Sequence, residues 1–244
     1  MLKPDRALLS MSAETFVMEH LLPMHPVAIV EGADFHFGKG RAGDVAVLSR
    51  LGQSHGFVAE VVPSADAVLE NLHIVTVSST LIRWLLQMGR VTDAAACLGG
   101  WFALSGTVCH GQQKGRTLNV PTANIDPAAT PELALPGDGV YAAVATLENG
   151  SHHAAAVSVG IKPTFAGRTR LIEAHLLDFQ GDLYGQTIRL SFRRWLREQM
   201  HFPSVNVLQS QLQRDIALAR RIQSQGVLTD DAPWPGFTQR AAAV

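Results

Sequence analysis

The chain has 244 residues, which can form one large domain or two modest ones, and 47% of them are hydrophobic, enough for a buried core. Its 20 Lys and Arg nearly balance its 21 Asp and Glu, so the composition excludes a broad basic field that attracts nucleic acid or anionic lipid. Two cysteines, Cys97 and Cys109, are too few for a disulfide framework, and no histidine lies in an HExxH motif, so we expect neither disulfides nor a transition-metal site.

The N-terminal residues carry no targeting or membrane-spanning pattern. Asp5, Glu14 and Glu19 interrupt the apolar residues of this segment. It therefore lacks the unbroken apolar core of a signal peptide or a membrane span. We expect a cytoplasmic protein that does not bind membranes.

Residues 12–99 show the alternation of helix and strand patterns that is typical of an α/β region. Strands are expected at residues 27–30 and 56–62. Helices are expected at residues 12–20, at residues 44–51 with Asp44 as the N-cap, from residues 78–80 to Gly89, and from Thr92 as the N-cap to Gly99.

The next ninety residues consist of short alternating segments separated by Gly, Pro and Asn, a pattern that indicates β-structure. Strand candidates are residues 102–108, 140–147, 154–159, 171–177 and 186–192. Several short strands with loops between them predict a small barrel or sandwich.

Helical spacing returns from residue 204. The apolar stripe of this predicted helix consists of Leu208, Leu212, Ile216, Ala219 and Ile222. We expect the helix to cover an open part of the barrel. The last residues, 227–244, have no periodicity and are expected to form a loose tail.

The segment HGQQKGRTLNVPTANI, residues 110–125, joins a basic glycine-rich loop to a Pro-Thr-Ala-Asn turn. Gly111 and Gly115 let the backbone approach a ligand closely, and Lys114 and Arg116 add positive charge. The loop is not a Walker A motif. On its own, such a loop is more often an exposed hairpin than a nucleotide site.

Thr122 and Asn124 favour the nucleotide interpretation. They are two residues apart on an extended segment, so their side chains project to the same side. Neutral oxygen ligands of this kind suit a Mg²⁺ ion that keeps several waters and also binds phosphate oxygens.

A second segment, LIEAHLLDFQGDLYG at residues 171–185, combines a strand pattern with a carboxylate. Its alternation of period two places Glu173 and His175 on one face and the apolar residues on the other. Glu173 then points to a wetter side, where it could accept a proton from an alcohol. The alternative is an ordinary solvated strand carboxylate.

These two segments occur together with GVYA at residues 139–142 and VGIKPTF at residues 159–165. In this combination, residues 101–225 resemble the riboflavin kinase domain of the bacterial bifunctional riboflavin kinase/FAD synthetase family. The resemblance implies an α+β protein, with a six-stranded Greek-key β-barrel and a C-terminal helix in residues 100–226. A partial α/β nucleotidyltransferase-like region, residues 1–99, would precede the barrel.

The same resemblance implies the substrates and their contacts. MgATP and riboflavin would bind on neighbouring sides of the PTAN segment, with Glu173 as the general base on the ribityl 5′-hydroxyl. Thr122 and Asn124 would hold Mg²⁺ and the ATP phosphates. The residues implied to contact ATP are Gly111, Lys114, Gly115, Arg116, Pro121, Thr122 and Asn124.

One position departs from the family pattern. Asn119 stands where the family usually has Gly before the PTAN segment. Asn accepts a left-handed backbone more readily than most residues, so we expect the turn to form. Its side chain could nevertheless crowd the nucleotide.

Two N-terminal segments, residues 31–48 and 77–86, resemble the FMN adenylyltransferase domain of the same family. The resemblance implies a flavin end formed by Asp34, Phe35, Phe37 and Gly38, and a nucleotide end formed by Ser78, Ser79, Thr80 and Arg83. The GxFDGxHxGH motif, which handles the ATP phosphates in that domain, does not occur in this sequence. We therefore expect a truncated domain with a vestigial site.

The leading hypothesis is an ATP:riboflavin 5′-phosphotransferase that gives FMN and uses Mg²⁺. Two alternatives stay open: a regulatory pseudoenzyme that binds flavin or nucleotide, and a bifunctional riboflavin kinase/FAD synthetase whose missing motif is supplied elsewhere. Retention of Glu173 favours the kinase, because a pure binding protein has little need of a base. Asn119 favours the pseudoenzyme.

Overall fold

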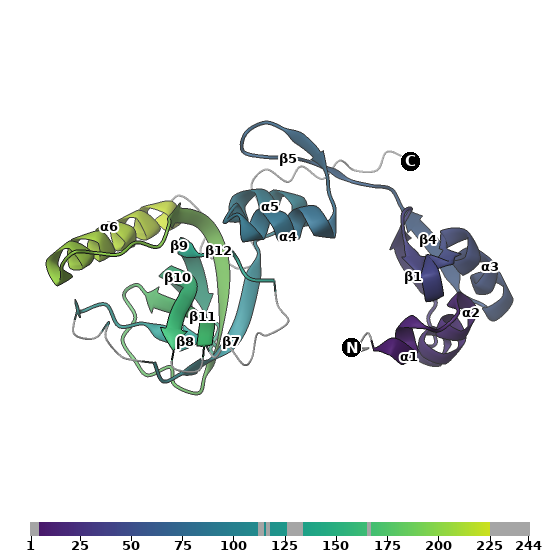
Figure 1. The fold of residues 1–244 in the computed structure, drawn as a ribbon, viewed down its shortest axis with the longest axis horizontal. Coiled ribbons are helices and arrows are strands. Elements are labelled where there is room, and N and C mark those ends of the chain that lie inside the picture. The colour runs from purple at the N-terminus through teal and green to yellow at the C-terminus, as the bar shows by residue number, and fades with distance from the viewer. Residues whose placement is uncertain (1–4, 112–114, 116–117, 126–133, 165–166, 225–244) are drawn as a thin grey trace. The chain divides into compact units, whose positions relative to one another are not determined.

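The computed structural model describes residues 5–111, 115, 118–125, 134–164 and 167–224. The chain divides into two compact units, Met1–Ala65 and Asp66–Val244, which can be followed by colour along the ribbon in Figure 1. Residues 66–99 therefore share a compact unit with the residues that follow them. The family-based boundary at residue 99 stays a proposal.

The first unit contains a parallel β–α–β arrangement. Strand β1 (Ala28–Gly32) pairs in parallel with β4 (Val58–Val62), and helix α3 (Val45–His55) lies between them in the sequence. Asp44 caps α3 as predicted, because its carboxylate accepts a hydrogen bond from the Val47 amide at 2.8 Å.

The predicted helix at residues 12–20 consists of α2 (Ala13–Phe16) and a π-helical continuation, η1 (Val17–Leu21). Ser12 caps it through the Thr15 amide at 3.1 Å. The short elements of this unit are α1 (Arg6–Leu9), η2 (Leu22–Met24), β2 (His36–Phe37), η3 (Lys39–Arg41) and β3 (Gly43–Asp44). The core of the unit is small, with the buried side chains Ala13, Val17, Phe37, Leu48, Leu51 and Phe57.

The second unit is built around a closed six-stranded barrel, which confirms the predicted fold (Figure 1). Neighbouring strands follow the order β10, β11, β8, β7, β12 and β9, and all pairs are antiparallel. The strands are β7 (Ala103–Cys109), β8 (Ala123–Ile125), β9 (Gly139–Thr146), β10 (His152–Thr164), β11 (Gly167–Leu176) and β12 (Thr187–Arg197). Each of the five predicted strand segments overlaps one of them.

Strand β9 is buried along nearly its whole length. Tyr141, Ala143 and Ala145 alternate along β9 and belong to the main hydrophobic core, where they are fully buried. The intervening residues of β9 are buried as well, so this strand is covered on both faces. The near-continuous apolar sequence GVYAAVAT suits that environment.

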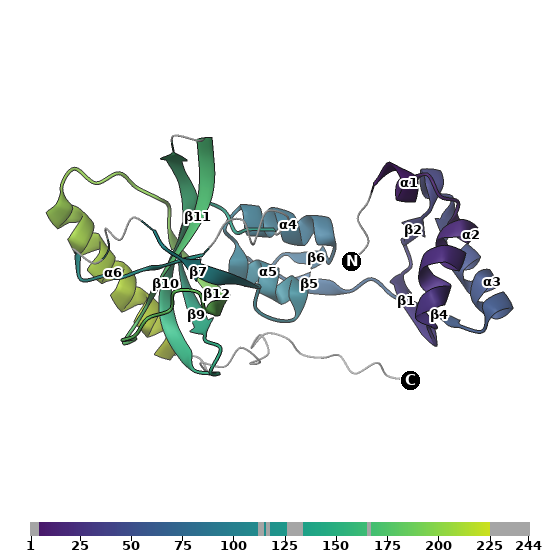
Figure 2. The ribbon, with the colours of Figure 1, turned by 90° about the horizontal axis from the view of Figure 1, so that it is seen from below.

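Helix α6 (Val205–Ser224) lies against the outside of the barrel, beside β9, β10 and β12 (Figure 2). It begins where the sequence predicts. Its buried Asp215 accepts hydrogen bonds from the Arg197 guanidinium at the end of β12, the shortest at 2.7 Å. The helix is thus attached by an ion pair as well as by its apolar stripe.

Residues 66–99 form a hairpin and two helices within the second unit. The hairpin is β5 (Asp66–Val68) with β6 (Ile74–Thr76), and the helices are α4 (Ser79–Gln87) and α5 (Val91–Leu98). Helix α4 begins within the predicted segment, and Ser78 caps it by accepting from the Leu81 amide at 3.2 Å. Leu85, Leu86 and Val91 pack into the same hydrophobic core as the barrel strands.

The prediction that Thr92 is the N-cap of α5 is wrong. The helix begins at Val91, and the N-cap residue, Arg90, makes no side-chain capping bond. Thr92 is buried inside the helix, and its hydroxyl donates to the Arg193 carbonyl of β12 at 3.3 Å. Because the helix packs against the barrel, this hydroxyl bonds a distant strand and does not cap its own helix. The prediction for the other end is confirmed, since Gly99 ends the helix in the left-handed conformation, with φ 70°.

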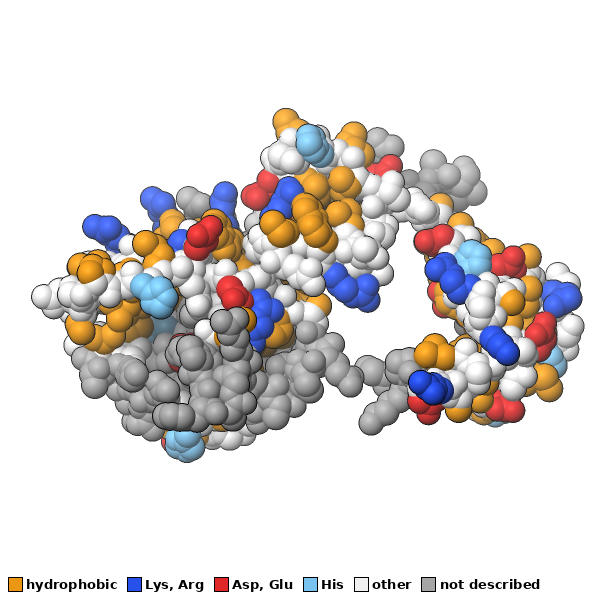
Figure 3. Space-filling model, viewed as in Figure 1, with side chains coloured by type: hydrophobic (Ala, Val, Ile, Leu, Met, Phe, Trp, Pro, Cys, Tyr) orange, Lys and Arg blue, Asp and Glu red, His pale blue; other side chains and the backbone are white. Residues whose placement is uncertain are grey.

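Figure 3 shows charged side chains of both signs interspersed over the visible face, as the balanced composition leads one to expect. Among the described residues, no helix is long and apolar enough to cross a membrane.

Candidate active site

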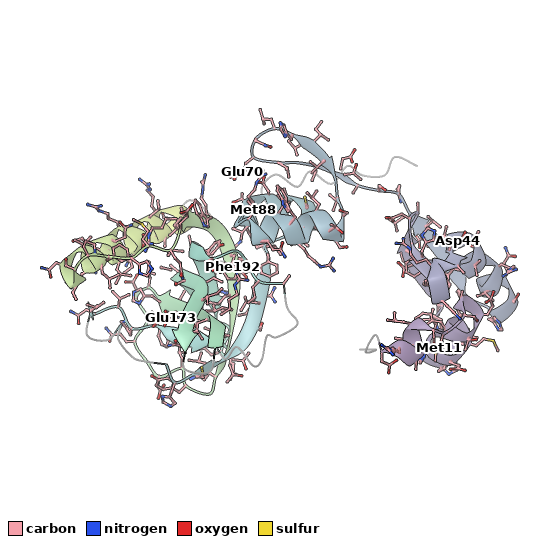
Figure 4. The ribbon with its side chains drawn as sticks, in the orientation of Figure 1. Met11, Asp44, Glu70, Met88, Glu173 and Phe192 are labelled. Carbon is pink, nitrogen blue, oxygen red and sulfur yellow. The ribbon has the colours of Figure 1, made fainter. Side chains whose placement is uncertain are left out.

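Strand β11 presents Glu173 as the sequence predicts. Ile172, Ala174 and Leu176 are buried on one face, while Glu173 and His175 are half-buried on the other. Figure 4 labels Glu173 on the barrel, below α6 in that view. The alternation of the sequence therefore places this carboxylate outside the barrel core.

The PTAN segment lies beside Glu173 through strand pairing. Asn124 of β8 is directly opposite Glu173 of β11, and Ala123 is opposite Ala174. Side chains at directly opposed positions project to the same face of a sheet. The two sequence segments that carried the family resemblance thus meet in space.

The turn before β8 depends on its glycines. A Cβ on Gly111 would overlap the amide group of Asn124, and a Cβ on Gly115 would overlap the carbonyl oxygen of Val120. The Val120 amide also donates to the Gly115 carbonyl at 2.9 Å. Here the glycines let the loop backbone lie directly on the PTAN turn, whereas the sequence alone suggested close approach to a ligand.

Asn119 adopts the left-handed conformation expected for it, with φ 57°. Its side chain is exposed and lines neither of the two cavities described below. Lys114 and Arg116, predicted to contact ATP, lie outside the described residues.

A cavity of about 390 Å³ lies between the barrel and α6. Glu173 and His175 of β11 line it together with Gly115, Val120 and Thr122 of the segment before β8. The remaining lining comes from β9, β10, the end of β12, the segment that follows β12, and α6: Val140, Ala156, Ser158, Arg197, Gln199, Met200, Phe202, Leu208, Leu212, Asp215 and Ile216. Its size is within the usual range for small-molecule sites.

A second, smaller cavity of about 90 Å³ lies on the other side of the turn. Pro121, Thr122, Phe179 and Tyr184 are among its lining residues. Tyr184 also stacks on His110, with ring centroids 3.8 Å apart. Thr122 lines both cavities, so the PTAN turn separates them.

Asn124 is less accessible than the sequence suggested. It is only 9% exposed and lines neither cavity, although it is paired with Glu173. Its side-chain amide N–H donates a hydrogen bond to the Thr122 carbonyl oxygen, with a nitrogen–oxygen distance of 3.4 Å. Its amide oxygen therefore faces away from that contact.

Sequence reasoning missed the polar groups at the α6 side of the large cavity. Arg197 is bonded to Asp215, and Gln199 donates to the Ser158 hydroxyl at 3.1 Å and to the Val159 carbonyl at 3.0 Å. One signal was available: Asp215 interrupts the apolar stripe of the predicted helix directly before Ile216. A carboxylate on an apolar face indicates a buried partner.

His175 was predicted only to share the face of Glu173. In the structure its Nδ1 lies 2.7 Å from the Pro121 carbonyl oxygen. A carbonyl can only accept, so Nδ1 carries the hydrogen. This bond ties β11 to the residue just before Thr122.

The residues expected at the vestigial adenylyltransferase site belong to two different units. Asp34, Phe35, Phe37 and Gly38 lie in the first unit, and Ser78, Ser79, Thr80 and Arg83 lie in the second. Phe37 is part of the small core, and a Cβ on Gly38 would overlap the Ala13 backbone. Phe37 and Gly38 thus have packing roles within the first unit. The binding roles implied for the eight residues of the vestigial site stay predictions.

No group of three or more His, Cys, Asp or Glu side chains that could hold a metal ion occurs among the described residues. A cation held by Thr122 and Asn124 alone would gain no protein charge from these neutral ligands. The donor set therefore suits a metal that arrives with negatively charged phosphates.

Comparisons with known proteins give the family. The Flavokinase model, described as riboflavin kinase, matches residues 98–223, and the FAD synthetase model matches residues 1–80. The bifunctional riboflavin kinase/FMN adenylyltransferase of Escherichia coli K12 is 36% identical over 218 residues, covering 88% of this chain and 67% of that protein. The corresponding Pseudomonas fluorescens protein is 36% identical over 220 residues, covering 89% and 68%.

A solved structure also matches. The crystal structure of a macrolide-efflux protein from Streptococcus pneumoniae has a TM-score of 0.71 and 29% sequence identity, covering 88% of this chain and 67% of that one. Fold, site and sequence relatives define a flavin-phosphorylating class of protein. The chain belongs to the bifunctional riboflavin kinase/FMN adenylyltransferase family.

Proposed function

We propose that the chain is a riboflavin kinase that transfers the γ-phosphate of ATP to the 5′-hydroxyl of riboflavin, giving FMN and ADP. The observation that carries this proposal is the convergence of Glu173 and Thr122 on one cavity of the riboflavin kinase domain. A base and a phosphate-side ligand that face the same cavity are what this transfer requires.

We assign riboflavin to the larger cavity. Its α6 side is lined by Met200, Phe202 and Leu212, which suit a flat, mostly apolar ring system. Its other end holds Glu173, so a ribityl chain extending from the ring would bring its terminal hydroxyl to the carboxylate.

We assign the ATP phosphates to the region of Thr122, with the nucleotide on the side of Phe179 and Tyr184. Thr122 lines both cavities, so the γ-phosphorus and the ribityl oxygen can meet at this residue. Positioning two reactants in this way supplies much of the acceleration in phosphoryl transfer.

In the transfer itself, Glu173 accepts the proton of the 5′-hydroxyl. The ribityl oxygen forms a bond to the γ-phosphorus while the bond from that phosphorus to the β,γ-bridging oxygen breaks, and ADP leaves with the electron pair. Mg²⁺, entering as MgATP, would neutralise phosphate charge, with Thr122 and Asn124 as its nearest protein ligands.

The proposal is tested by incubating the purified chain with riboflavin and ATP, with Mg²⁺ or with excess EDTA. We expect FMN only when nucleotide and divalent cation are both present. A folded chain that binds riboflavin but forms no FMN at saturating substrates would instead be a flavin-binding pseudoenzyme.

A further inference from the structure

Strand β8 is too short to hold the residue on which the proposed chemistry depends. It has three residues, and its pairing with β11 ends at Ala123 opposite Ala174. Thr122 lies one residue beyond that pairing. Contacts beyond the β11 ladder therefore contribute to its position.

The next residue along β11 supplies the contact. His175 follows Ala174, and its Nδ1–H donates to the Pro121 carbonyl at 2.7 Å, within the range of a good N–H···O bond. This carbonyl belongs to the peptide group that joins Pro121 to Thr122. Pro121 itself has no N–H to offer, so the carbonyl is the only backbone group through which this residue can be hydrogen-bonded.

The hydrogen bond also relates the two reacting sides of the site. Glu173 and His175 are alternate residues on the same face of β11, and both line the larger cavity together with Thr122. A shift of His175 along β11 would move the turn relative to Glu173. The short His175 bond and the longer Asn124 bond to the Thr122 carbonyl, at 3.4 Å, are thus two side-chain contacts on this turn, and the His175 bond joins it directly to the strand of Glu173.

We infer that His175 is a positioning residue for phosphoryl transfer, holding Thr122 in place through its Nδ1–H bond to the Pro121 carbonyl. This inference rests on the proposed function. It predicts that the hydrogen at the δ position matters, and that the ring itself does not. If His175 merely filled space on the strand, the size of its side chain would matter and the hydrogen at the δ position would not.

Three substitutions separate these roles. His175→Asn keeps an N–H group near the position of Nδ1, His175→Gln places its N–H group near the position of Nε2, and His175→Ala has neither. We expect the Asn variant to stay within about three-fold of the parent chain. The Gln and Ala variants should lose roughly 10- to 100-fold in kcat, because displacement of a reacting group by about 1 Å has effects of this order.

Binding supplies a readout that does not depend on turnover. Calorimetry with MgADP should show weaker binding in the Gln and Ala variants and near-normal binding in the Asn variant. Thermal unfolding of each variant identifies any that fails to fold.

The tautomer can be observed directly. Nitrogen-15 chemical shifts of the His175 ring should show a hydrogen on Nδ1. Equal MgADP affinities in the Asn and Ala variants, or an Nε2–H tautomer in the folded chain, would overturn the inference. Because the tautomer and the nucleotide binding are measured without catalysis, a parent chain that makes no FMN would refute the proposed function and leave this test intact.

Discussion

The two compact units differ in how completely their sheets are built. In the second unit six strands close into a barrel, and each strand pairs on both sides. In the described part of the first unit, the parallel sheet has two strands, and Val30 and Val58 on it are 54% and 63% exposed. Parallel sheets are ordinarily covered on both faces. The comparison teaches that both halves of a family resemblance can be real although, among the described residues, their sheets are completed to different degrees.

The largest difference between the units should appear in catalysis. Glu173→Gln removes the proposed base from the barrel and keeps the size of the side chain. We expect kcat for FMN formation to fall by roughly 10²–10⁴, the usual contribution of a positioned general base. Steady-state kinetics with riboflavin and ATP measure the change.

The matched control for this substitution is Glu31→Gln in the first unit. Burial raises the pKa of Glu31, which lies on β1, but our account gives that carboxylate no part in the reaction. Its kinase activity should equal that of the parent chain. A Glu173→Gln variant within a few-fold of the parent would return Glu173 to the role of a solvated strand carboxylate.

The second difference concerns ion pairs. In the barrel unit, Asp215 is buried and Arg197 half-buried, with side chains 5% and 17% exposed, whereas Arg50 and Glu14 of the first unit are 67% and 51% exposed. Arg197→Met should cost about 3–5 kcal/mol, because it leaves a buried carboxylate unpaired. Arg50→Met should cost at most about 1 kcal/mol.

Urea unfolding of the two variants measures these costs. The double variant Arg197→Met with Asp215→Leu should recover much of the stability, since neither charge then remains buried alone. If Arg197→Met and Arg50→Met were equally mild, the ion pair would not be what attaches α6 to the barrel.

The metal requirement tests two proposed ligands of the barrel unit that differ in their access to the cavities. Thr122 lines both cavities, while Asn124 is enclosed beneath Gly111. We expect Thr122→Ala and Asn124→Ala each to raise the Mg²⁺ concentration needed for half-maximal activity, by about ten-fold, because a water must replace a lost ligand. Mg²⁺ titrations at fixed ATP test this, and unchanged midpoints in both variants would refute the ligand assignment.

The smallest expected effect is a pH-dependent one on the outside of the barrel unit. Arg220 of α6 hydrogen-bonds Asp178 and lowers the pKa of that carboxyl group below its ordinary value. A depressed pKa in the folded state stabilises the fold above the unfolded-state pKa, and the contribution disappears as the pH falls through the folded-state pKa.

Asp178→Asn should therefore lower the melting temperature slightly at neutral pH and not at all near pH 2. Melting curves of the parent and the variant across this range measure the difference. A gap that widened in acid would show that the carboxylate is not the stabilising species.

Much of the fold follows from the sequence because local patterns and packing agree there. Asp44 caps its helix as predicted, and the alternation around Glu173 selects the correct face of β11. Thr92 was misread because a local capping rule cannot see the Arg193 carbonyl, which lies about a hundred residues away in the sequence. The β5–β6 hairpin was not predicted, because its strands have only three residues each.

The candidate site was predictable only in part for the same physical reason. Motifs identified Thr122, Asn124 and Glu173, and the structure places them on paired strands or just beside them. His175, Gln199 and Asp215 act through contacts that join distant segments, such as the bond from His175 to Pro121. The spacing of residues along the sequence does not predict such contacts. The exception is Asp215, whose carboxylate within an apolar stripe indicates a buried partner.

The most direct test of the central claim is the identity of the flavin product. The purified chain is incubated with riboflavin, ATP and Mg²⁺, and in parallel with FMN, ATP and Mg²⁺, and the flavins are separated by chromatography. The account predicts FMN from the first mixture and no FAD from the second, because the chain has no HxGH motif to hold the departing pyrophosphate. FAD formation at a rate comparable to that of FMN, abolished by Arg83→Ala while the kinase reaction persists, would contradict it.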